Sequence, residues 1–157
     1  MPLQLTYHAE TSLPVELAGL TPSWAHDKSL ADIGRWEIFQ GNQRRPLSAL
    51  FAVAGDPSDL EIDLHGDLSG VHGIGAQMRE GQLRVHGSAG RHLGSQMSGG
   101  VLKVYGDTPD WTGAEMRGGL IHVHGSTGPL AGAVYRGSAL GMTDGTLLID
   151  GDAGDEV

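Results

Sequence analysis

One five-residue pattern recurs every 19 residues, as Leu83-Arg84-Val85-His86-Gly87, Leu102-Lys103-Val104-Tyr105-Gly106 and Ile121-His122-Val123-His124-Gly125. Apolar side chains alternate with polar ones and a glycine closes each segment, which is typical of a short strand ended by a turn. Related segments at 62–66 and 147–151 come two residues early and seven residues late. A fixed spacing of this kind indicates stacked coils that each contribute one strand.

A second unit, Gly-x-x-Met or Gly-x-x-Tyr, has the same period, with copies that begin at Gly75, Gly94, Gly113 and Gly132. Glycine takes 26 of the 157 positions. A helix loses about 1 kcal/mol at each interior glycine, so strands and turns are favoured. We predict an all-β solenoid, a right-handed parallel β-helix with coils of about 19 residues. The left-handed form repeats in hexapeptides, and a period of 19 residues is not a multiple of six.

Equivalent side chains of successive coils should then form columns that point into the core. We expect Val85, Val104 and Val123 to lie over one another in sequence order. The full predicted columns are Leu83, Leu102, Ile121 and Leu147; Val85, Val104, Val123 and Ile149; and Met78, Met97, Met116 and Tyr135.

The repeat divides the chain into two predicted parts. Residues 1–58 lack it and form a small mixed α/β cap, and residues 59–157 form about four and a half coils. The spacing of the last strand places a further Gly-x-x-Met at position 158. We therefore expect the final coil to be shortened or to be covered by another chain.

Short signals within the cap predict its elements. Leu3, Leu5 and Tyr7 alternate with polar residues as in an edge strand. Ser29 is placed to cap a helical turn, and residues 41–42, Gly-Asn, are placed to form a two-residue hairpin turn.

The extra residues before the last strand occupy positions 138–144. A loop that leaves a regular stack displays its apolar side chains for contact, unless it folds back on its own coil. We therefore predict an interface at Tyr135, Arg136, Leu140 and Met142. Arg91, Arg117 and Arg136 fall in turns and could add a basic patch.

Composition excludes several classes of protein. Ten lysines and arginines against nineteen acidic residues give a formal charge of −9, which repels nucleic acid and anionic lipid. The absence of cysteine excludes disulfides, iron–sulfur clusters and thiolate zinc sites. No apolar run approaches the roughly 20 residues of a membrane span, and no signal peptide is evident, so we predict a cytoplasmic protein.

Eight histidines raise the question of a metal site. His122 and His124 share the outward face of one strand, and His86 and His65 hold the same outward position in earlier coils. Against a metal, Tyr105 interrupts this ladder and no acidic residue sits regularly beside it. We expect no catalytic, cofactor-binding or metal residue, with His86, His122 and His124 kept as metal candidates.

Segments around and within the coils add a family resemblance. They are WEIFQGNQRRPLSALF at 36–51, Gly66-Asp67-Leu68-Ser69 with Gly73-Ile74-Gly75, and Tyr135-Arg136-Gly137-Ser138 with Gly141-Met142. With the coils, these segments resemble the C subunit of formylmethanofuran dehydrogenases and of the related bacterial formyltransferase/hydrolase complex.

The resemblance implies a noncatalytic scaffold subunit in one-carbon metabolism. Its partners would be an amidohydrolase-like A subunit, a B subunit and a formyltransferase subunit of the D type. The complex would move a formyl group between tetrahydromethanopterin and methanofuran or methylofuran, with no cofactor bound by this chain. The chain has two lysines against eight arginines and abundant alanine and glycine, which favours the bacterial hydrolase complex over the redox enzyme.

Two other functions stay open at this stage. The coils also resemble the glycine-rich C-terminal domain of glutamate synthase large subunits, which would make the chain a spacer domain. The outward histidines would instead suit a small metalloprotein that uses His65, His86, His122 and His124.

Overall fold

The computed structural model describes residues 2–9, 12–133 and 142–154. These residues form two sheets of seven and four strands with short helices. The first part of the chain contains β1 (Leu3–Tyr7), β2 (Val15–Glu16), α1 (Pro22–Ala25), α2 (Leu30–Arg35), β3 (Glu37–Gln40), β4 (Gln43–Pro46), α3 (Leu47–Leu50), β5 (Phe51–Ala54) and the 3₁₀ turn η1 (Pro57–Asp59). The second part contains β6 (Glu61–His65), β7 (Val71–His72), β8 (Gln82–His86), β9 (Val101–Val104), β10 (Leu120–Val123) and β11 (Thr146–Ile149).

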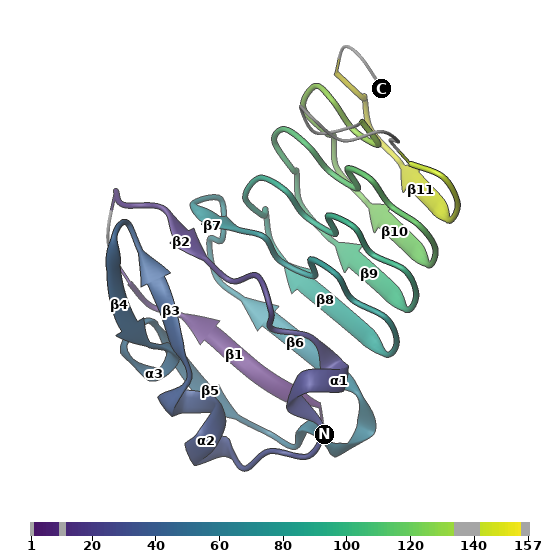
Figure 1. Ribbon diagram of the computed structural model, residues 1–157. Coiled ribbons are helices and arrows are strands. Elements are labelled where there is room, and N and C mark those ends of the chain that lie inside the picture. Colours follow the sequence, from purple (N-terminus) through teal and green to yellow (C-terminus); the bar gives the residue numbers. More distant parts are fainter. Residues whose placement is uncertain (1, 10–11, 134–141, 155–157) are drawn as a thin grey trace.

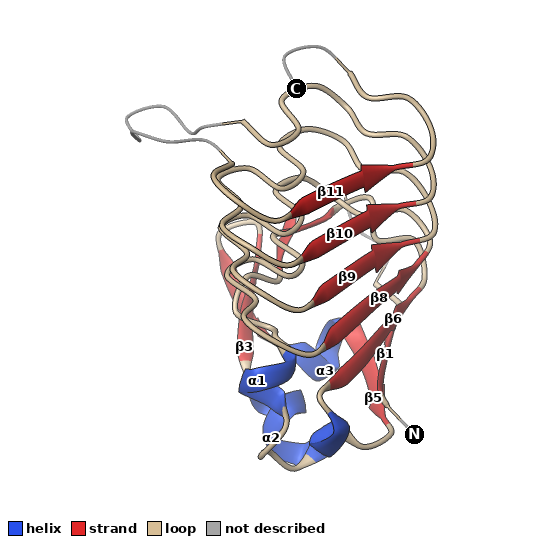
Figure 2. Ribbon diagram, turned by 90° about the vertical axis from the view of Figure 1, so that its right-hand side faces the viewer, coloured by secondary structure: helices blue, strands red, loops and turns tan. Residues whose placement is uncertain are grey.

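The seven-stranded sheet runs in the order β11-β10-β9-β8-β6-β1-β5, and Figure 2 shows its strands rising one above another. From β1 to β11 neighbouring strands are parallel, and β5 pairs with β1 antiparallel. Val85 lies opposite Val104, and Val104 opposite Val123. The predicted 19-residue register is therefore confirmed.

The four-stranded sheet has the order β4-β3-β2-β7. Residues 41–42 connect β3 to β4, with Gln40 opposite Gln43, so the predicted hairpin is confirmed. Ser29 accepts a hydrogen bond from the Asp32 amide and caps α2, as expected. The helices lie at the β1–β5 end of the molecule (Figure 1).

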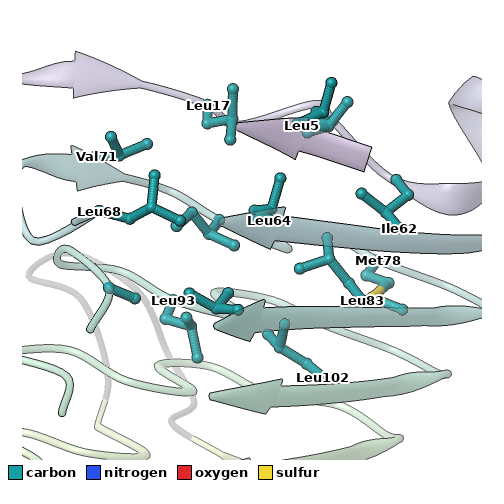
Figure 3. Packing of buried hydrophobic residues seen from close by; sticks show 14 of the residues in the cluster. Leu5, Leu17, Ile62, Leu64, Leu68, Val71, Met78, Leu83, Leu93 and Leu102 are labelled. Atoms are coloured by element: carbon teal, nitrogen blue, oxygen red, sulfur yellow. The ribbon is translucent and has the colours of Figure 1, made fainter. Parts of the chain in front are cut away.

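The core lies between the seven-stranded sheet and the segments that face it. Leu83, Leu102 and Ile121 are fully buried, as are Met78 and Met97. Figure 3 shows Leu5 beside Leu64, and Ile62 beside Leu83, as parts of an apolar layer that continues from β1 into the coils. Burial of each such side chain contributes about 1.5–3 kcal/mol. Leu147 and Ile149 on β11 are only partly buried.

Glycine is required where one coil turns into the next strand. Gly119, which precedes β10, has φ +82°, and a Cβ there would lie 2.8 Å from the carbonyl oxygen of Gly100. Gly100 repeats this geometry one coil earlier, with φ +86° and 2.8 Å to the Gly81 oxygen. Left-handed backbone and close approach both favour glycine, which accounts for part of the glycine excess.

The prediction of an all-β solenoid with right-handed parallel β-helix coils is wrong. The described residues form one long mixed sheet and a second, smaller mixed sheet. Outside the named strands, the described residues form isolated β-bridges from Leu68 to Ala89 and from Thr108 to Thr127. Single backbone hydrogen bonds, such as that from the Gln96 amide to the Ala114 carbonyl at 2.9 Å, also join successive coils there. The Gly-x-x-Met units prevent further strands there, because Gln77 and Gln96 within them adopt φ near +60°.

The expected edge strand at residues 3–7 is also misplaced. β1 lies inside the sheet between β5 and β6, with Leu3 and Leu5 fully buried. Alternation alone cannot separate an edge strand from a central one when the second face is polar. The division of the chain at residue 58 stays a prediction. Among the described helices, none has the length and apolarity needed to cross a bilayer, and the cytoplasmic location stays a prediction.

Candidate functional site

Polar side chains alternate with the core columns and lie on the other side of the seven-stranded sheet, which we call the outward face. Parallel strands in register bring equivalent side chains to about 4.8 Å from one another. Two outward columns result. The first contains Asp63, Arg84, Lys103 and His122, and the second contains His65, His86, Tyr105 and His124.

The second column is a continuous stack of rings. The ring centroids of His65 and His86 lie 4.5 Å apart, those of His86 and Tyr105 5.2 Å, and those of Tyr105 and His124 4.8 Å. All three pairs are within 15° of parallel. Tyr105 therefore continues the ladder that the sequence led us to regard as interrupted.

On β6, Asp63 is 7% exposed and forms an ion pair with the guanidinium of Arg84. Arg84 Nε donates to Asp63 Oδ1 at 2.7 Å, and Arg84 Nη1 donates to Glu61 Oε1 at 3.1 Å. His86 Nε2 lies 3.0 Å from the same Asp63 oxygen. Burial acts to raise the pKa of Asp63, but the hydrogen bonds from Arg84 and His86 outweigh it and hold the pKa below its ordinary value.

On the same face, Asp150 follows β11 and faces two imidazoles. His122 Nε2 lies 3.0 Å and His124 Nδ1 3.1 Å from Asp150 Oδ2. The two rings lie 3.9 Å apart between centroids. The hydrogen bond with His122 is the main cause of a lowered pKa for Asp150. We call these three residues the Asp150 cluster.

The three histidine candidates thus divide between two carboxylates. His122 and His124 meet at Asp150, whereas His86 pairs with Asp63. Our expectation that acidic residues would not accompany the histidines missed both aspartates. The 26-residue spacing between the last two strands places position 150 opposite position 124, and this signal would have found Asp150. The expectation that no residue is catalytic or binds a cofactor stays a prediction.

A second feature is an open groove of about 550 Å³ beside α1. Trp24 contributes to one wall, and Arg79 and Arg117 contribute positive charge. Gln77 donates to Gln96 at 3.1 Å, and Gln96 donates to the buried carboxylate of Glu115 at 3.1 Å. Arg91 lines a different groove, beside His72, so Arg91 and Arg117 do not form the single basic patch that we considered.

The predicted interface lies mostly outside the described residues. Tyr135, Arg136 and Leu140 belong to the segment 134–141 and receive no structural account. Met142 is half-buried and packs against the core, and its amide donates to the Gly132 carbonyl at 3.0 Å. The interface role of all four residues stays a prediction.

Comparison with known proteins places this architecture. No family model matches the sequence. Over 85 residues the chain is 39% identical to the C subunit of the molybdenum-containing formylmethanofuran dehydrogenase 1 of Methanosarcina barkeri. Over 92 residues it is 34% identical to the C subunit of the tungsten-containing formylmethanofuran dehydrogenase 2 of Methanococcus maripaludis. Over about half of its length, the chain resembles the C subunits of formylmethanofuran dehydrogenases.

A solved structure extends the likeness to almost the whole length of the chain. A chain of the formyltransferase/hydrolase complex from Methylorubrum extorquens, crystallised with methylofuran, superposes with a TM-score of 0.92 over 98% of the residues at 27% identity. The matches span 52% and 58% of this chain but only 28% and 34% of the two dehydrogenase subunits, and the chain covers 58% of the solved one.

Proposed function

We propose that the chain is a noncatalytic scaffold subunit of a formyltransferase/hydrolase-type complex in one-carbon metabolism. In this proposal it holds an amidohydrolase-like A subunit, a B subunit and a formyltransferase subunit of the D type. The assembled complex moves a formyl group between tetrahydromethanopterin and a furan cofactor such as methylofuran or methanofuran. The chain itself binds neither cofactor.

The observation that carries the proposal is the superposition on a chain of the Methylorubrum extorquens complex, at a TM-score of 0.92 over 98% of the residues. At 27% identity this likeness extends well beyond the 85 and 92 residues of the matches to the dehydrogenase subunits. The identity to the dehydrogenase proteins gives independent support, because those proteins are also C subunits.

The outward face supports a structural role for its titratable groups. His65 and His86 are stacked on each other, and His86 also contacts the buried Asp63. A general acid or base must reach a substrate proton at hydrogen-bond distance. Here the rings are engaged with neighbours along a regular surface, which suits contact with other subunits.

Affinity capture from the native host tests the proposal. The chain carries an N-terminal tag and is expressed from its own locus, and the captured proteins are identified by mass spectrometry. We expect amidohydrolase-like and formyltransferase subunits in a fixed ratio. Recovery of the tagged chain alone, or with glutamate synthase, would overturn the proposal.

Two glycine variants provide a matched control for the capture. Gly119→Ala introduces a clash with the preceding coil, whereas a Cβ at Gly70 meets nothing within 4 Å. We expect Gly70→Ala to capture the same partners as the wild type and Gly119→Ala to capture less. Equal capture by both variants would indicate binding that does not need the stacked coils.

A further inference from the structure

We propose that His122, His124 and Asp150 form a binding site for a divalent transition-metal ion, and that Zn²⁺ is the ion that fits it best. The inference concerns this chain alone and does not rest on the proposed function. It begins from a single observation, the convergence of two imidazoles on one carboxylate at the outer end of the stack.

The chemistry of the three side chains suits such an ion. Imidazole and carboxylate are ordinary zinc ligands, and zinc sites with two histidines and one acidic residue leave a fourth position for water. Among the described residues, these are the three whose histidine and carboxylate ligand atoms gather within 4.8 Å of one another. No cysteine is needed for this ligand set.

The distances are close to those of a metal-bound set. With zinc bonds of about 2.0–2.1 Å, neighbouring ligand atoms of a tetrahedral site lie about 3.3 Å apart. Asp150 Oδ2 lies 3.0 Å from His122 Nε2 and 3.1 Å from His124 Nδ1. His124 is about one third exposed, so its ring has room to rotate toward an ion.

The backbone fixes where the ligands stand. His122 and His124 are two residues apart on β10 and point to the same face. The Asp150 amide donates to the Val123 carbonyl at 2.9 Å, which continues the pairing of β10 with β11 and places its side chain beside His124. An ion at this point joins β10 and β11, the last two strands at one edge of the sheet.

Charge distinguishes this cluster from the other carboxylate of the same face. Asp63 is bound by the guanidinium of Arg84, a permanent cation. Among the described residues, Asp150 forms its ion pairs with His122 and His124 alone, and neither lysine nor arginine is paired with it. The position on β11 beside His122 is Leu148, which supplies no charge. A bound metal ion supplies the cation that arginine supplies at Asp63.

Metal binding to the full chain tests the inference. After treatment with a chelator, the chain is titrated with Zn²⁺ in a calorimeter and with Co²⁺ while its visible absorption is recorded. We expect one ion per chain and the Co²⁺ spectrum of a four-coordinate site. His122→Gln and Asp150→Asn should each weaken Zn²⁺ binding by about 100-fold or more, because loss of even an outer-sphere partner costs 10- to 100-fold.

His86→Gln is the matched control. His86 lies in the same column as His124, but it contacts Asp63 and not Asp150. We expect it to leave Zn²⁺ affinity within about twofold of the wild type. Circular dichroism of each variant confirms that it is folded. Absence of saturable binding to the wild type overturns the site, as does binding that survives both Asp150→Asn and His122→Gln or that is lost equally in His86→Gln.

Discussion

Asp63 and Asp150 lie on the same outward face of one sheet, but their surroundings are opposite. Asp63 is 7% exposed and held by Arg84, Glu61 being a second acceptor of the same guanidinium. Asp150 is exposed and meets only imidazoles among the described residues. A regular stack repeats the backbone positions from coil to coil, but the neighbouring side chains differ. Those neighbours decide whether a carboxylate stabilises the fold, as at Asp63, or is available to a ligand, as we propose for Asp150.

The largest expected difference between the two regions is in stability. Arg84→Met leaves the buried Asp63 carboxylate without its guanidinium, so we expect the free energy of unfolding to fall by about 3 kcal/mol. Chemical denaturation at pH 7 measures it. Lys103→Met is the control, because Lys103 holds the equivalent position on β9 and forms no ion pair with a described residue. Equal losses in both variants would contradict the role given to Arg84.

The pH dependence of stability should follow Asp63. Its pKa is lowered in the folded chain, so its contribution to stability is complete above the ordinary pKa of about 4 and is lost as pH falls through the lowered value. We expect denaturation midpoints to decline on acidification from pH 5 to pH 3, and to decline less in Arg84→Met. An identical acid decline in wild type and variant would show that Asp63 is not the responsible group.

Tyr105 connects the two regions through ring stacking, and its loss should have a smaller effect. Tyr105→Ala removes the contacts with His86 and His124, for which we expect a loss of about 0.5–1 kcal/mol. Tyr105→Phe keeps the ring and should match the wild type in the same denaturation experiment. A loss in Tyr105→Phe as large as in Tyr105→Ala would assign the effect to the hydroxyl instead of the stack.

The smallest effect is expected at Asp150 in the absence of metal. Asp150→Asn should lower the thermal midpoint of the chelator-treated chain only slightly, because the carboxylate is exposed and its ion pairs with the two histidines are screened by solvent. Added Zn²⁺ should raise the midpoint of the wild type but not that of the variant. A marked drop in the metal-free variant would mean that Asp150, like Asp63, serves stability.

The coil register was predictable because one spacing recurs in strong apolar positions. Val85, Val104 and Val123 pair as the 19-residue period requires, and the hairpin at 41–42 followed from its Gly-Asn pair. The β-helix was not a correct prediction, because a period reports stacking but not which parts of each coil are extended. Residues with left-handed backbone conformation, such as Gln96, interrupt strands on the far side of the coils. Glutamine has no preference for that conformation, so the sequence does not indicate it.

The candidate site was also predicted only in part from the sequence. The histidines were found because they alternate with core residues. Their grouping around two aspartates was missed, since Asp63 lies two residues before His65 and Asp150 lies beyond an insertion. β6 and β8 pair at a spacing of 21 residues, and β10 and β11 at a spacing of 26, instead of 19. Contacts between these strands follow only when the exact spacing is applied, and the alternation within one strand does not give it.

We propose that this chain supports a formyl-transferring complex without supplying a reacting group. The most direct test of this proposal is the turnover of purified complex in which His65, His86, His122 and His124 are all replaced by Gln, expressed per assembled complex. We predict a rate within about twofold of the wild type. Loss of a general acid or base costs about 100-fold or more, so a fall of that size in fully assembled complex would contradict the account.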